Sequence, residues 1–175
     1  MLSLRIATQD DEPAMRALMQ RAIAELLKPY LPAEGIAASF EVMGLDSQLI
    51  ADGTYFAVLD NDIIAGCGGW SRRATLFGGD HSKGRDAALL DPARDAARVR
   101  AMYTDPAHTR RGIGRMILDA CEAAARTEGF TRVELAATLA GEPLYRACGY
   151  QTIEHFVSRT STGIDVPLIR MGKAL

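Results

Sequence analysis

The stretch between residues 98 and 128 constrains the possible fold more than any other part of the chain. It begins with RVRAMYTD, whose alternation is typical of a β-strand, and Pro106 ends that strand. Apolar side chains then recur at helical spacing over residues 112–128. Gly112 and Gly114 stand where this helix begins, although glycine is a poor helix former. Since glycine is common where a backbone must come close to another group, the turn predicts such an approach between strand and helix.

Both elements predict which side chains face the core. On the strand, one face is predicted to carry Val99, Ala101 and Tyr103. On the helix, the predicted buried stripe consists of Ile113, Met116, Ile117, Ala120, Cys121 and Ala124. The face predicted to be exposed to solvent consists of Arg115, Asp119, Glu122 and Arg126. On that face Glu122 and Arg126 have the spacing of a favourable ion pair.

Alternating apolar and polar residues predict the remaining strands. These cover residues 2–7, 54–59, 63–71, 131–138, 150–159 and 165–173. The second and third of them are joined by DND and form a predicted hairpin. Glycines at 66, 68 and 69 predict close backbone packing or a bulge in that hairpin.

Three further helices complete the pattern. An amphipathic helix is predicted over residues 10–28, with Asp10 as its cap and Pro13 in its first turn. A shorter helix over residues 33–45 is predicted to turn inward the side chains of Ile36, Phe40 and Met43. A short third helix is expected over residues 141–149, where Gly149 ends it, as Gly129 ends the long helix.

The order of these elements defines the fold class. It runs strand, helices, hairpin, strand, helix, strand, helix and two strands, which predicts an α/β or α+β domain with a mixed sheet. No linker, repeat or low-complexity tract divides the chain, so a single domain is expected over residues 1–175. Residues 72–97 are rich in glycine and charge and lack periodicity. A loop of that length in a compact domain is usually functional or disordered.

Composition and charge exclude several classes of protein. The formal net charge is −2, so no overall basic field favours a nucleic acid or an anionic membrane. No window approaches 18 uninterrupted apolar residues, and the N-terminus lacks a signal-peptide pattern. The three cysteines are widely spaced and the three histidines are isolated, so we expect neither a disulfide framework nor a metal site. A cytoplasmic location fits these features.

Three phosphate-binding interpretations of the glycine turn compete. A dinucleotide fingerprint, G-x-G-x-x-G, lacks its last glycine because Ile117 stands there. A P-loop starting at Gly79 fails because Arg85 and Asp86 replace the Lys and the Ser or Thr that its mechanism needs. In the third interpretation, free N–H groups at the start of the helix bind an anion with the help of the helix dipole.

The third interpretation accounts for the residues of the turn. Gly112 and Gly114 place no Cβ in the way of a pyrophosphate. Positive charge can be added by Arg110, Arg111 and Arg115. The alternatives are a tight connection without a ligand and a solvated arginine face, in which Arg115 pairs with Asp119.

At these residues the chain resembles the GNAT superfamily of N-acetyltransferases, whose acetyl-CoA loop reads Q/R-x-x-G-x-G/A. Residues Thr109–Gly114 match at both glycines, while Thr109 replaces the first Gln or Arg. A second match lies about 30 residues downstream, where PLYRACGY resembles the family's x-L-Y-x-x-x-G-F/Y element. The element order fits as well, so the resemblance covers most of the chain.

The resemblance implies a mixed, mostly antiparallel sheet flanked by helices, with acetyl-CoA as the acyl donor. The pantetheine arm would pair with the backbone of Met102, Tyr103 and Thr104. The pyrophosphate would lie on the N–H groups of Arg110, Arg111, Gly112, Ile113, Gly114 and Arg115. In the family this strand splays from the strand after the long helix, here residues 131–136, and the thioester enters the gap.

The implied reaction moves an acetyl group to a primary amine, with a small molecule as the expected acceptor. Tyr145, the tyrosine of the second motif, would supply a proton or a hydrogen bond to the leaving thiolate. A backbone N–H near Met102 or Tyr103 would stabilise the oxyanion. The strand before the glycine turn holds no carboxylate. Candidates for the base are therefore Glu41, a carboxylate in residues 72–97, or a chain of water molecules.

Other interpretations stay open at the level of sequence. A non-catalytic acyl-CoA sensor or regulatory domain would share the fold, although Tyr145 favours an enzyme. A nucleotide-binding protein would bind NAD or ATP in place of CoA. The sequence does not identify the acceptor, because small-molecule amines, amino acids, antibiotics and protein N-termini all occur in the family. The oligomeric state is also open, with homodimers common among similar proteins. Trp70 is expected either to pack in the core or to line the acceptor pocket.

Overall fold

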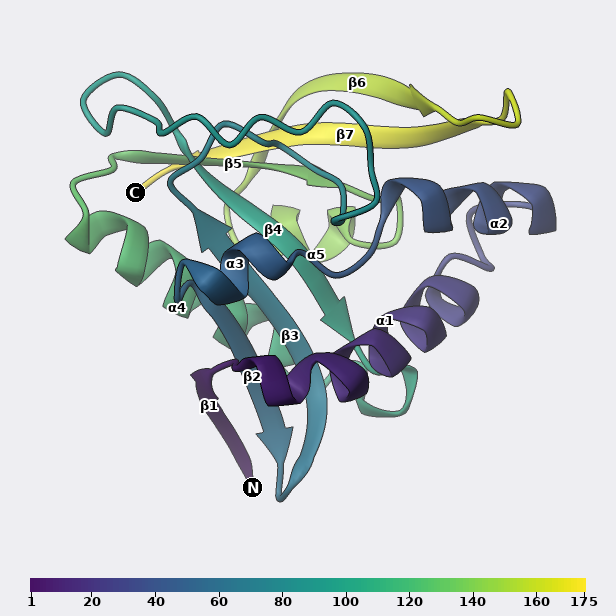
Figure 1. Cartoon of the computed structure of the whole chain (residues 1–175), viewed down its shortest axis with the longest axis horizontal. Coiled ribbons are helices and arrows are strands. Elements are labelled where there is room, and N and C mark those ends of the chain that lie inside the picture. The colour runs from purple at the N-terminus through teal and green to yellow at the C-terminus, as the bar shows by residue number, and fades with distance from the viewer.

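The computed structural model describes residues 1–175 and places seven strands in one sheet (Figure 1). The strands are β1 (Leu2–Ile6), β2 (Tyr55–Asp60), β3 (Ile63–Ser71), β4 (Ala97–Thr104), β5 (Arg132–Ala137), β6 (Gln151–Arg159) and β7 (Asp165–Ala174). The helices are α1 (Glu12–Leu26), α2 (Ala33–Val42), α3 (Ser47–Ala51), α4 (Ile113–Thr127) and α5 (Glu142–Ala147). The sheet order is β1-β2-β3-β4-β5-β7-β6, and only β4 and β5 run parallel. The predicted mixed, mostly antiparallel sheet is confirmed.

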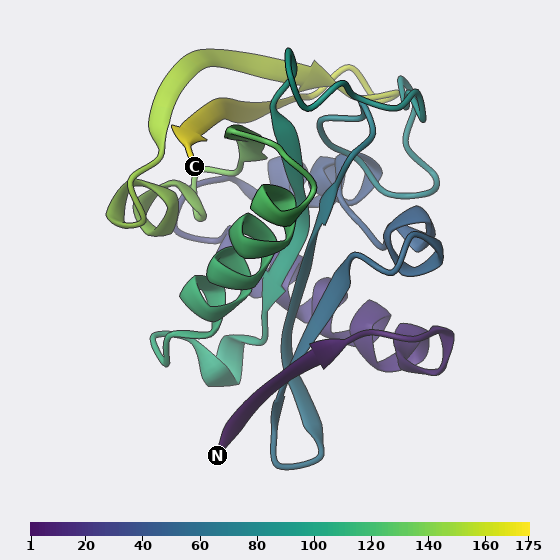
Figure 2. The same cartoon turned by 90° about the vertical axis from the view of Figure 1, so that its left-hand side faces the viewer.

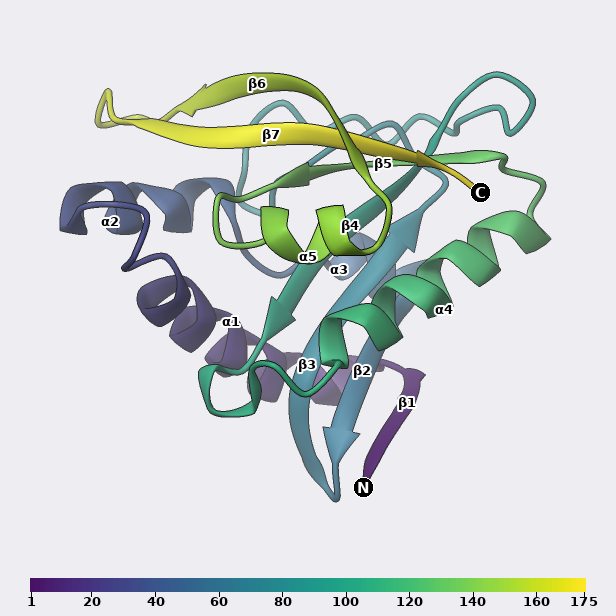
Figure 3. The same ribbon diagram turned by 180° about the vertical axis from the view of Figure 1, so that it is seen from behind.

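Helices cover both faces of this sheet. Figures 1 and 3 show α1, α2 and α3 on one face and α4 and α5 on the other. Figure 2 shows the sheet from its edge, between α1 and α4. One buried cluster joins α4 to the strands and includes Ile117 and Cys121. A second cluster lies under α1 and includes Met15 and Leu18. The two amphipathic helices thus bury their apolar stripes against opposite faces of the sheet.

None of the helices can cross a membrane. The longest, α1 and α4, have 15 residues each. No helix combines the length and the apolar character that a membrane span requires.

Glycines in β3 allow close packing, as predicted. A Cβ on Gly66 would lie 2.4 Å from Cγ2 of Ile113 in α4. A Cβ on Gly68 would lie 2.6 Å from Cγ of Met102 in β4. The register of the hairpin itself shifts between Val58 and Leu59 of β2, which pair with Gly66 and Ile64 of β3, so the predicted bulge is present as well.

A second bulge, in β4, corrects the predicted faces of that strand. Ala101 and Met102 both stand opposite Gly68 of β3. Ala101 has a φ of +50°, in the left-handed region that residues with a Cβ rarely adopt. Val99 packs with the cluster on the α4 side, whereas Tyr103 packs with the cluster on the α1 side. The prediction that Val99, Ala101 and Tyr103 share one face is therefore wrong, because an extra residue inverts the alternation.

β4 and β5 diverge soon after they begin. Their parallel pairing covers only Ala97 with Val133 and Arg98 with Glu134. From Val99 onward, the edge of β4 that faces β5 pairs with no strand. β5 instead continues along β7, with which it pairs over its whole length. This divergence leaves an opening in the middle of the sheet.

The structure corrects the starts and faces of two helices. Thr8, not Asp10, is the N-cap of the first turn, a 3-10 helix over Gln9–Asp11 that leads into α1. Asp11 completes a capping box, because its carboxylate accepts a hydrogen bond from the Thr8 N–H at 2.8 Å. In α2 the predicted inward face is wrong, since Phe40 is 37% exposed and Ile36 and Met43 are only partly buried. The buried residues of α2 are instead Gly35, Ala38, Ser39 and Val42. Small residues let this helix approach its neighbours closely, so hydrophobicity alone pointed to the wrong side.

In α4 the predicted wet face is wrong at one residue. Glu122 is buried, and its carboxylate lies 2.8 Å from Nζ of Lys173 and accepts a hydrogen bond from Tyr150 at 3.1 Å. The ion pair with Arg126 forms at 3.6 Å as predicted. The stripe also rotates slightly, because three of its predicted members are only partly buried: Met116, Ala120 and Ala124. Leu118 and Ala125 are buried in their place.

Candidate active site

A cavity of about 110 Å³ opens where β4 and β5 diverge. Its inner wall consists of residues 99–103 of β4 together with Leu135 and Ala136 of β5. Tyr145 of α5 lines it from the α4 side of the sheet. Residues 42–44, at the end of α2, and residues 76–78, in the long loop, line it as well. The predicted cofactor residues Met102 and Tyr103 therefore border the cavity, while Thr104 lies at the end of β4 opposite Gly66.

The glycine turn leaves a run of backbone N–H groups without partners. From Arg110 to Arg115, no backbone N–H donates a hydrogen bond to another group of the protein. Gly112 is the N-cap of α4 with a φ of +83°, and a Cβ built on it meets nothing within 4 Å. Arg110 also has a positive φ of +62°. The turn is thus an open, donor-rich surface at a helix N-terminus, which is suited to an anion.

The second glycine of the motif has a packing role. A Cβ on Gly114 would lie 2.5 Å from Cδ2 of Leu144, in α5. Glycine at this position lets the start of α4 contact the helix that carries Tyr145. The glycine turn and Tyr145 are therefore connected through one side chain, Leu144. Ile113, between the two glycines, is a buried core residue.

The three predicted arginines differ in their surroundings. Arg110 is exposed and has no ion-pair partner. Arg111 binds Asp60 at 2.7 Å, across the β2–β3 hairpin. Arg115 donates a hydrogen bond to the carbonyl of Ala147 at 3.3 Å and does not pair with Asp119. Only Arg110 is thus wholly available to a ligand phosphate.

Tyr145 is buried and its hydroxyl is unpaired. The residue is 8% exposed, and its ring packs edge-on against Tyr150 with centroids 5.9 Å apart. The hydroxyl makes no hydrogen bond within the protein and is not fully enclosed, so it stays accessible from the cavity that Tyr145 lines. Burial raises the pKa of Tyr145 well above that of an exposed tyrosine. The side chain therefore stays protonated and can donate a hydrogen bond into the cavity.

No carboxylate lines the cavity. Glu41, one candidate base, points elsewhere: its carboxylate accepts hydrogen bonds from the N–H and the hydroxyl of Ser161, both at 2.8 Å. These hydrogen bonds lower the pKa of Glu41, which makes it a weaker base. In the long loop, Asp80 accepts from Ser47 and Asp86 from the N–H of Ala88, so neither faces the cavity. The structure therefore places neither Glu41 nor a carboxylate of residues 72–97 at the cavity wall, where a general base would be needed.

The sequence interpretation missed the buried charge beside the cavity. Arg100 of β4 lines the cavity and forms an ion pair with Asp46 at 2.7 Å, with both side chains almost fully buried. Its only sequence signal is an arginine inside a predicted strand, which Arg98 provides as well. Asp46 comes from the cap of α3, an element too short to leave a periodic pattern.

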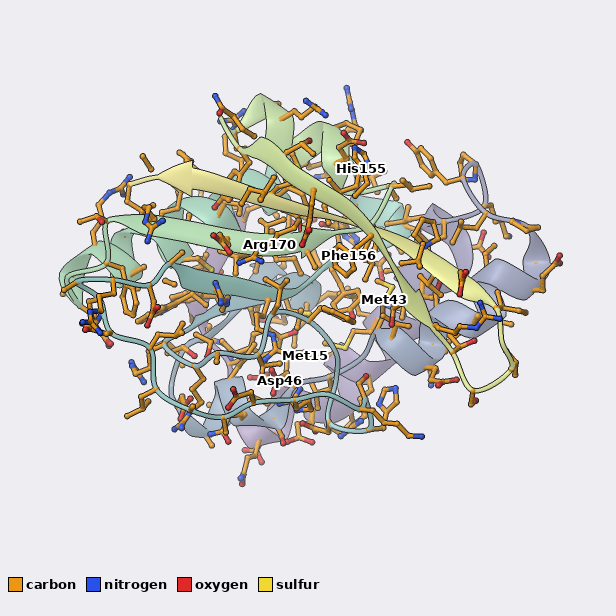
Figure 4. All side chains as sticks on the ribbon, turned by 90° about the horizontal axis from the view of Figure 1, so that it is seen from above. Met15, Met43, Asp46, His155, Phe156 and Arg170 are labelled. Atoms are coloured by element: carbon orange, nitrogen blue, oxygen red, sulfur yellow. The ribbon has the colours of Figure 1, made fainter.

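Apolar side chains close the outer end of the cavity. In Figure 4, Met43 and Phe156 lie near each other, and both pack against the cluster of α2 and β7 that contains Leu168. Phe77 of the long loop packs against Phe156 with ring centroids 5.6 Å apart. The loop over residues 72–97 is thus docked onto the sheet, and its residues 76–78 form part of the cavity wall.

Other residues considered from the sequence lie away from the cavity. Trp70 is 2% exposed and packs edge-on against Phe130, so it belongs to the core. His81 contacts the Phe40 carbonyl at 2.7 Å. Cys121 is fully buried, and burial raises the pKa of its thiol. The structure brings together no three His, Cys, Asp or Glu side chains that could hold a metal ion.

Comparisons with known proteins agree with this geometry. The profile described as the Acetyltransferase (GNAT) family matches residues 15–150. A GCN5-related N-acetyltransferase from Rhodopseudomonas palustris has a TM-score of 0.72 at 17% identity, with 99% of this chain and 95% of that chain covered. PaiA N-acetyltransferase from Thermoplasma acidophilum, in complex with coenzyme A, has a TM-score of 0.66 at 12% identity, with coverage of 100% and 99%.

A third similar structure is yncA from Salmonella typhimurium, solved with its cofactor acetyl-CoA. Its TM-score is 0.65 at 16% identity, with 100% of this chain and 94% of that chain covered. At these identities the solved structures support the fold alone. A comparison with curated proteins found no match.

Proposed function

The chain belongs to the Acetyltransferase (GNAT) family, and we propose that it transfers the acetyl group of acetyl-CoA to the primary amine of a small molecule. One observation carries the proposal. Tyr145 lines the opening between β4 and β5, and the unpaired edge of β4 leads at its C-terminal end to the turn whose free N–H groups begin α4. An acyl donor with a phosphate-bearing end and a reactive end can use both. We further propose that residues 1–175 form one such domain.

The chain's own residues suit each part of acetyl-CoA. The pyrophosphate would accept hydrogen bonds from the N–H groups between Arg110 and Arg115, where the helix dipole adds attraction. The pantetheine arm would add to the unpaired edge of β4 at residues 102–104, as an extended peptide adds to a sheet edge. The thioester would then enter the cavity. Two of the similar structures contain coenzyme A or acetyl-CoA, which supports this choice of donor.

Tyr145 is the proposed acid. When the amine nitrogen attacks the thioester carbonyl, the C–S bond breaks and the sulfur leaves with negative charge. A buried hydroxyl in the wall of the cavity can hydrogen-bond that sulfur or give it a proton. The raised pKa of Tyr145 keeps the hydroxyl protonated across the neutral range. Charge on the carbonyl oxygen would be met by a backbone N–H of β4 near Met102.

The amine must be neutral before it attacks. Free alkylamines have a pKa of about 10.4, so a proton has to leave. Because no carboxylate lines the cavity, we assign this step to water rather than to Glu41. An apolar wall also lowers the pKa of an amine that enters, since burial disfavours the charged form. The small volume of the cavity favours the amine of a small molecule over a folded protein surface.

Release of coenzyme A tests the proposal directly. The purified chain is incubated with acetyl-CoA and a mixed panel of primary amines, and free thiol is followed with a colorimetric reagent. We expect amine-dependent thiol release and an acetylated product of the matching mass. Binding of acetyl-CoA without turnover across a broad panel would support a sensor instead. Tight binding of NAD or ATP, with no affinity for CoA, would contradict the assignment of the glycine turn.

A further inference from the structure

Three charged side chains meet beside the cavity, and their charges do not cancel. Asp46 is fully buried and lies 2.7 Å from Nη1 of Arg100 and 2.8 Å from Nη2 of Arg85. Both guanidinium groups also donate to the carbonyl oxygen of Gly78, which lines the cavity. Two arginines therefore share one carboxylate. Since arginine stays protonated in proteins, the cluster carries one positive charge in excess.

No other acidic group offsets this excess from inside the site. Asp80 is the next carboxylate along the loop, and it is exposed and accepts from the N–H of Ser47 at 2.9 Å. Glu134 on β5 pairs with Arg98 and Arg170, and Figure 4 shows Arg170 well apart from Asp46. The excess positive charge therefore attracts an anion most strongly at the cavity wall, because little water is present there to screen it.

Arg100 keeps N–H groups that have no partner in the protein. Its side chain is 2% exposed and lines the cavity. Nη1 faces Asp46 and Nη2 faces Gly78, whereas Nε–H has no hydrogen-bond partner. A buried donor without a partner costs free energy, so a ligand atom that accepts from it gains affinity. Burial opposes the charge on Arg100 and lowers its pKa, so an anion nearby would be doubly favoured.

Much of the rest of the wall is apolar. Val42, Met43, Phe77 and Leu168 all line the cavity and pack together as one apolar cluster. A ligand that fits must therefore carry a negative group for Arg100 and an apolar group for this cluster. Arg100 and Met102 are two residues apart along β4 and both line the cavity. A single short molecule can span both.

We propose that the acceptor is an amino acid with an apolar side chain, and that Arg100 determines this specificity by attracting its carboxylate. The inference rests on the acetyl transfer proposed above and names the substrate class for the same site. The amine faces the thioester, the carboxylate faces Arg100, and the side chain packs between Met43 and Phe77. A second positive charge on the acceptor is disfavoured, which excludes polyamines and aminoglycosides.

The experiment compares acceptors that differ only in the carboxylate. Leucine, methionine and phenylalanine are each paired with the amine that lacks the carboxylate: isoamylamine, 3-(methylthio)propylamine and phenethylamine. We expect kcat/KM for the acids, calculated on the concentration of neutral amine at the assay pH, to exceed that for the amines by at least about tenfold, the size of one hydrogen bond to a charged group. The comparison needs no variant, so it is independent of folding.

Variants then separate specificity from structure. Arg100→Gln should reduce the acid-to-amine ratio toward one while leaving the KM for acetyl-CoA within about twofold, and Arg100→Lys should restore part of the ratio. Arg73→Gln is the matched control, because Arg73 also ties the long loop to the body through an ion pair, with Asp52 at 2.7 Å, but does not line the cavity. It should keep the wild-type ratio.

The outcomes are distinct. If the amines without a carboxylate are used equally well, or if neither series is used, this substrate assignment is wrong. The acetyl transfer itself fails only if no amine of a broader panel releases coenzyme A. If Arg73→Gln lowers the ratio as much as Arg100→Gln does, the effect comes from a displaced loop and the role of Arg100 is overturned.

Discussion

The hydroxyl of Tyr55 donates a hydrogen bond to the carbonyl oxygen of Ala101 across 2.8 Å. Tyr55 lies on β2 and is fully buried, so its ring passes β3 to reach β4. Ala101 is the residue of β4 with a φ of +50°. The hydrogen bond thus supports the bulge in β4, and this bulge lies within residues 99–103, which line the cavity.

Replacing Ala101 with glycine should stabilise the chain. A left-handed residue with a Cβ costs roughly 1–2 kcal/mol, while glycine costs roughly 0.5–1 kcal/mol in the entropy of the unfolded state. We expect Ala101→Gly to raise the free energy of unfolding by up to about 1 kcal/mol, measured by urea denaturation. Ala101→Val should lower it, because a β-branched side chain tolerates a positive φ least. A glycine variant less stable than wild type would mean that the bulge is not strained.

Gly114 and Leu144 should behave as a coupled pair. A Cβ at Gly114 would lie 2.5 Å from Leu144, so Gly114→Ala displaces that side chain in the wild-type background. In a Leu144→Ala background the space is free. We expect Gly114→Ala to be more favourable there by about 1 kcal/mol, as a double-mutant cycle of thermal or urea unfolding measures. If the effects of the two substitutions on the free energy of unfolding are additive, α5 accommodates the added Cβ without a loss of stability.

The alternation of apolar and polar residues was sufficient to predict the main strands and helices, because the periodic segments are long. All seven strands and the helices α1, α2, α4 and α5 were predicted near their observed positions. α3 was missed because its five residues carry no periodic signal. The predicted face of β4 was wrong because an alanine at position 101 gives no indication in the sequence of a positive φ. Glu122 looked solvated because its partners, Tyr150 and Lys173, are distant in sequence and only the fold brings them to α4.

The sequence predicted the cofactor end of the candidate site better than the acceptor end. The glycine turn and Tyr145 belong to local motifs, and the structure places them on the same face of the sheet, where Leu144 connects the start of α4 to α5. The acceptor end is built from α2, the long loop and β7, which share no motif. The buried pair of Arg100 and Asp46 depends on two residues 54 positions apart, by their numbers in the chain. Only tertiary structure reveals such a pair.

Gly112→Asp should abolish binding of acetyl-CoA. The position is open, but its φ of +83° strains any side chain, so the matched control is Gly112→Asn, which has the same shape without the charge. Both variants should fold, since Asn and Asp tolerate this conformation best. We expect the aspartate to weaken binding on the order of 100-fold through repulsion of the phosphates. Calorimetry with acetyl-CoA measures this. If the two variants bind acetyl-CoA with equal affinity, the phosphates do not bind at this turn.

Asp11 should stabilise the chain in a pH-dependent way. Its carboxylate forms two hydrogen bonds of 2.7 Å with Arg5, and this guanidinium lowers the pKa of Asp11 to about 2. A lowered folded-state pKa gives stability that is present above the unfolded value of about 3.9 and is lost as the pH falls toward 2.

Asp11→Asn should therefore reduce stability at pH 7 by about 1 kcal/mol, an effect discounted because Arg5 is partly exposed. The difference from wild type should shrink between pH 5 and pH 2 in urea denaturation. The control is Asp10→Asn, because Asp10 is exposed and makes no hydrogen bond through its side chain. A difference that stays constant over this range would show that the carboxylate of Asp11 is not the group responsible.

Tyr145→Phe should lower kcat by a factor on the order of 100, the usual contribution of a general acid. The ring and its packing against Tyr150 are kept, so the affinity for acetyl-CoA should change little. Because burial raises the pKa of Tyr145, wild-type kcat should not fall through ionisation of this group as the pH rises through 9. Tyr150→Phe is the control: it removes a buried hydroxyl, bonded to Glu122 at 3.1 Å, from a residue outside the cavity lining. If Tyr145→Phe keeps near wild-type kcat where chemistry limits turnover, Tyr145 is a packing residue and water protonates the thiolate.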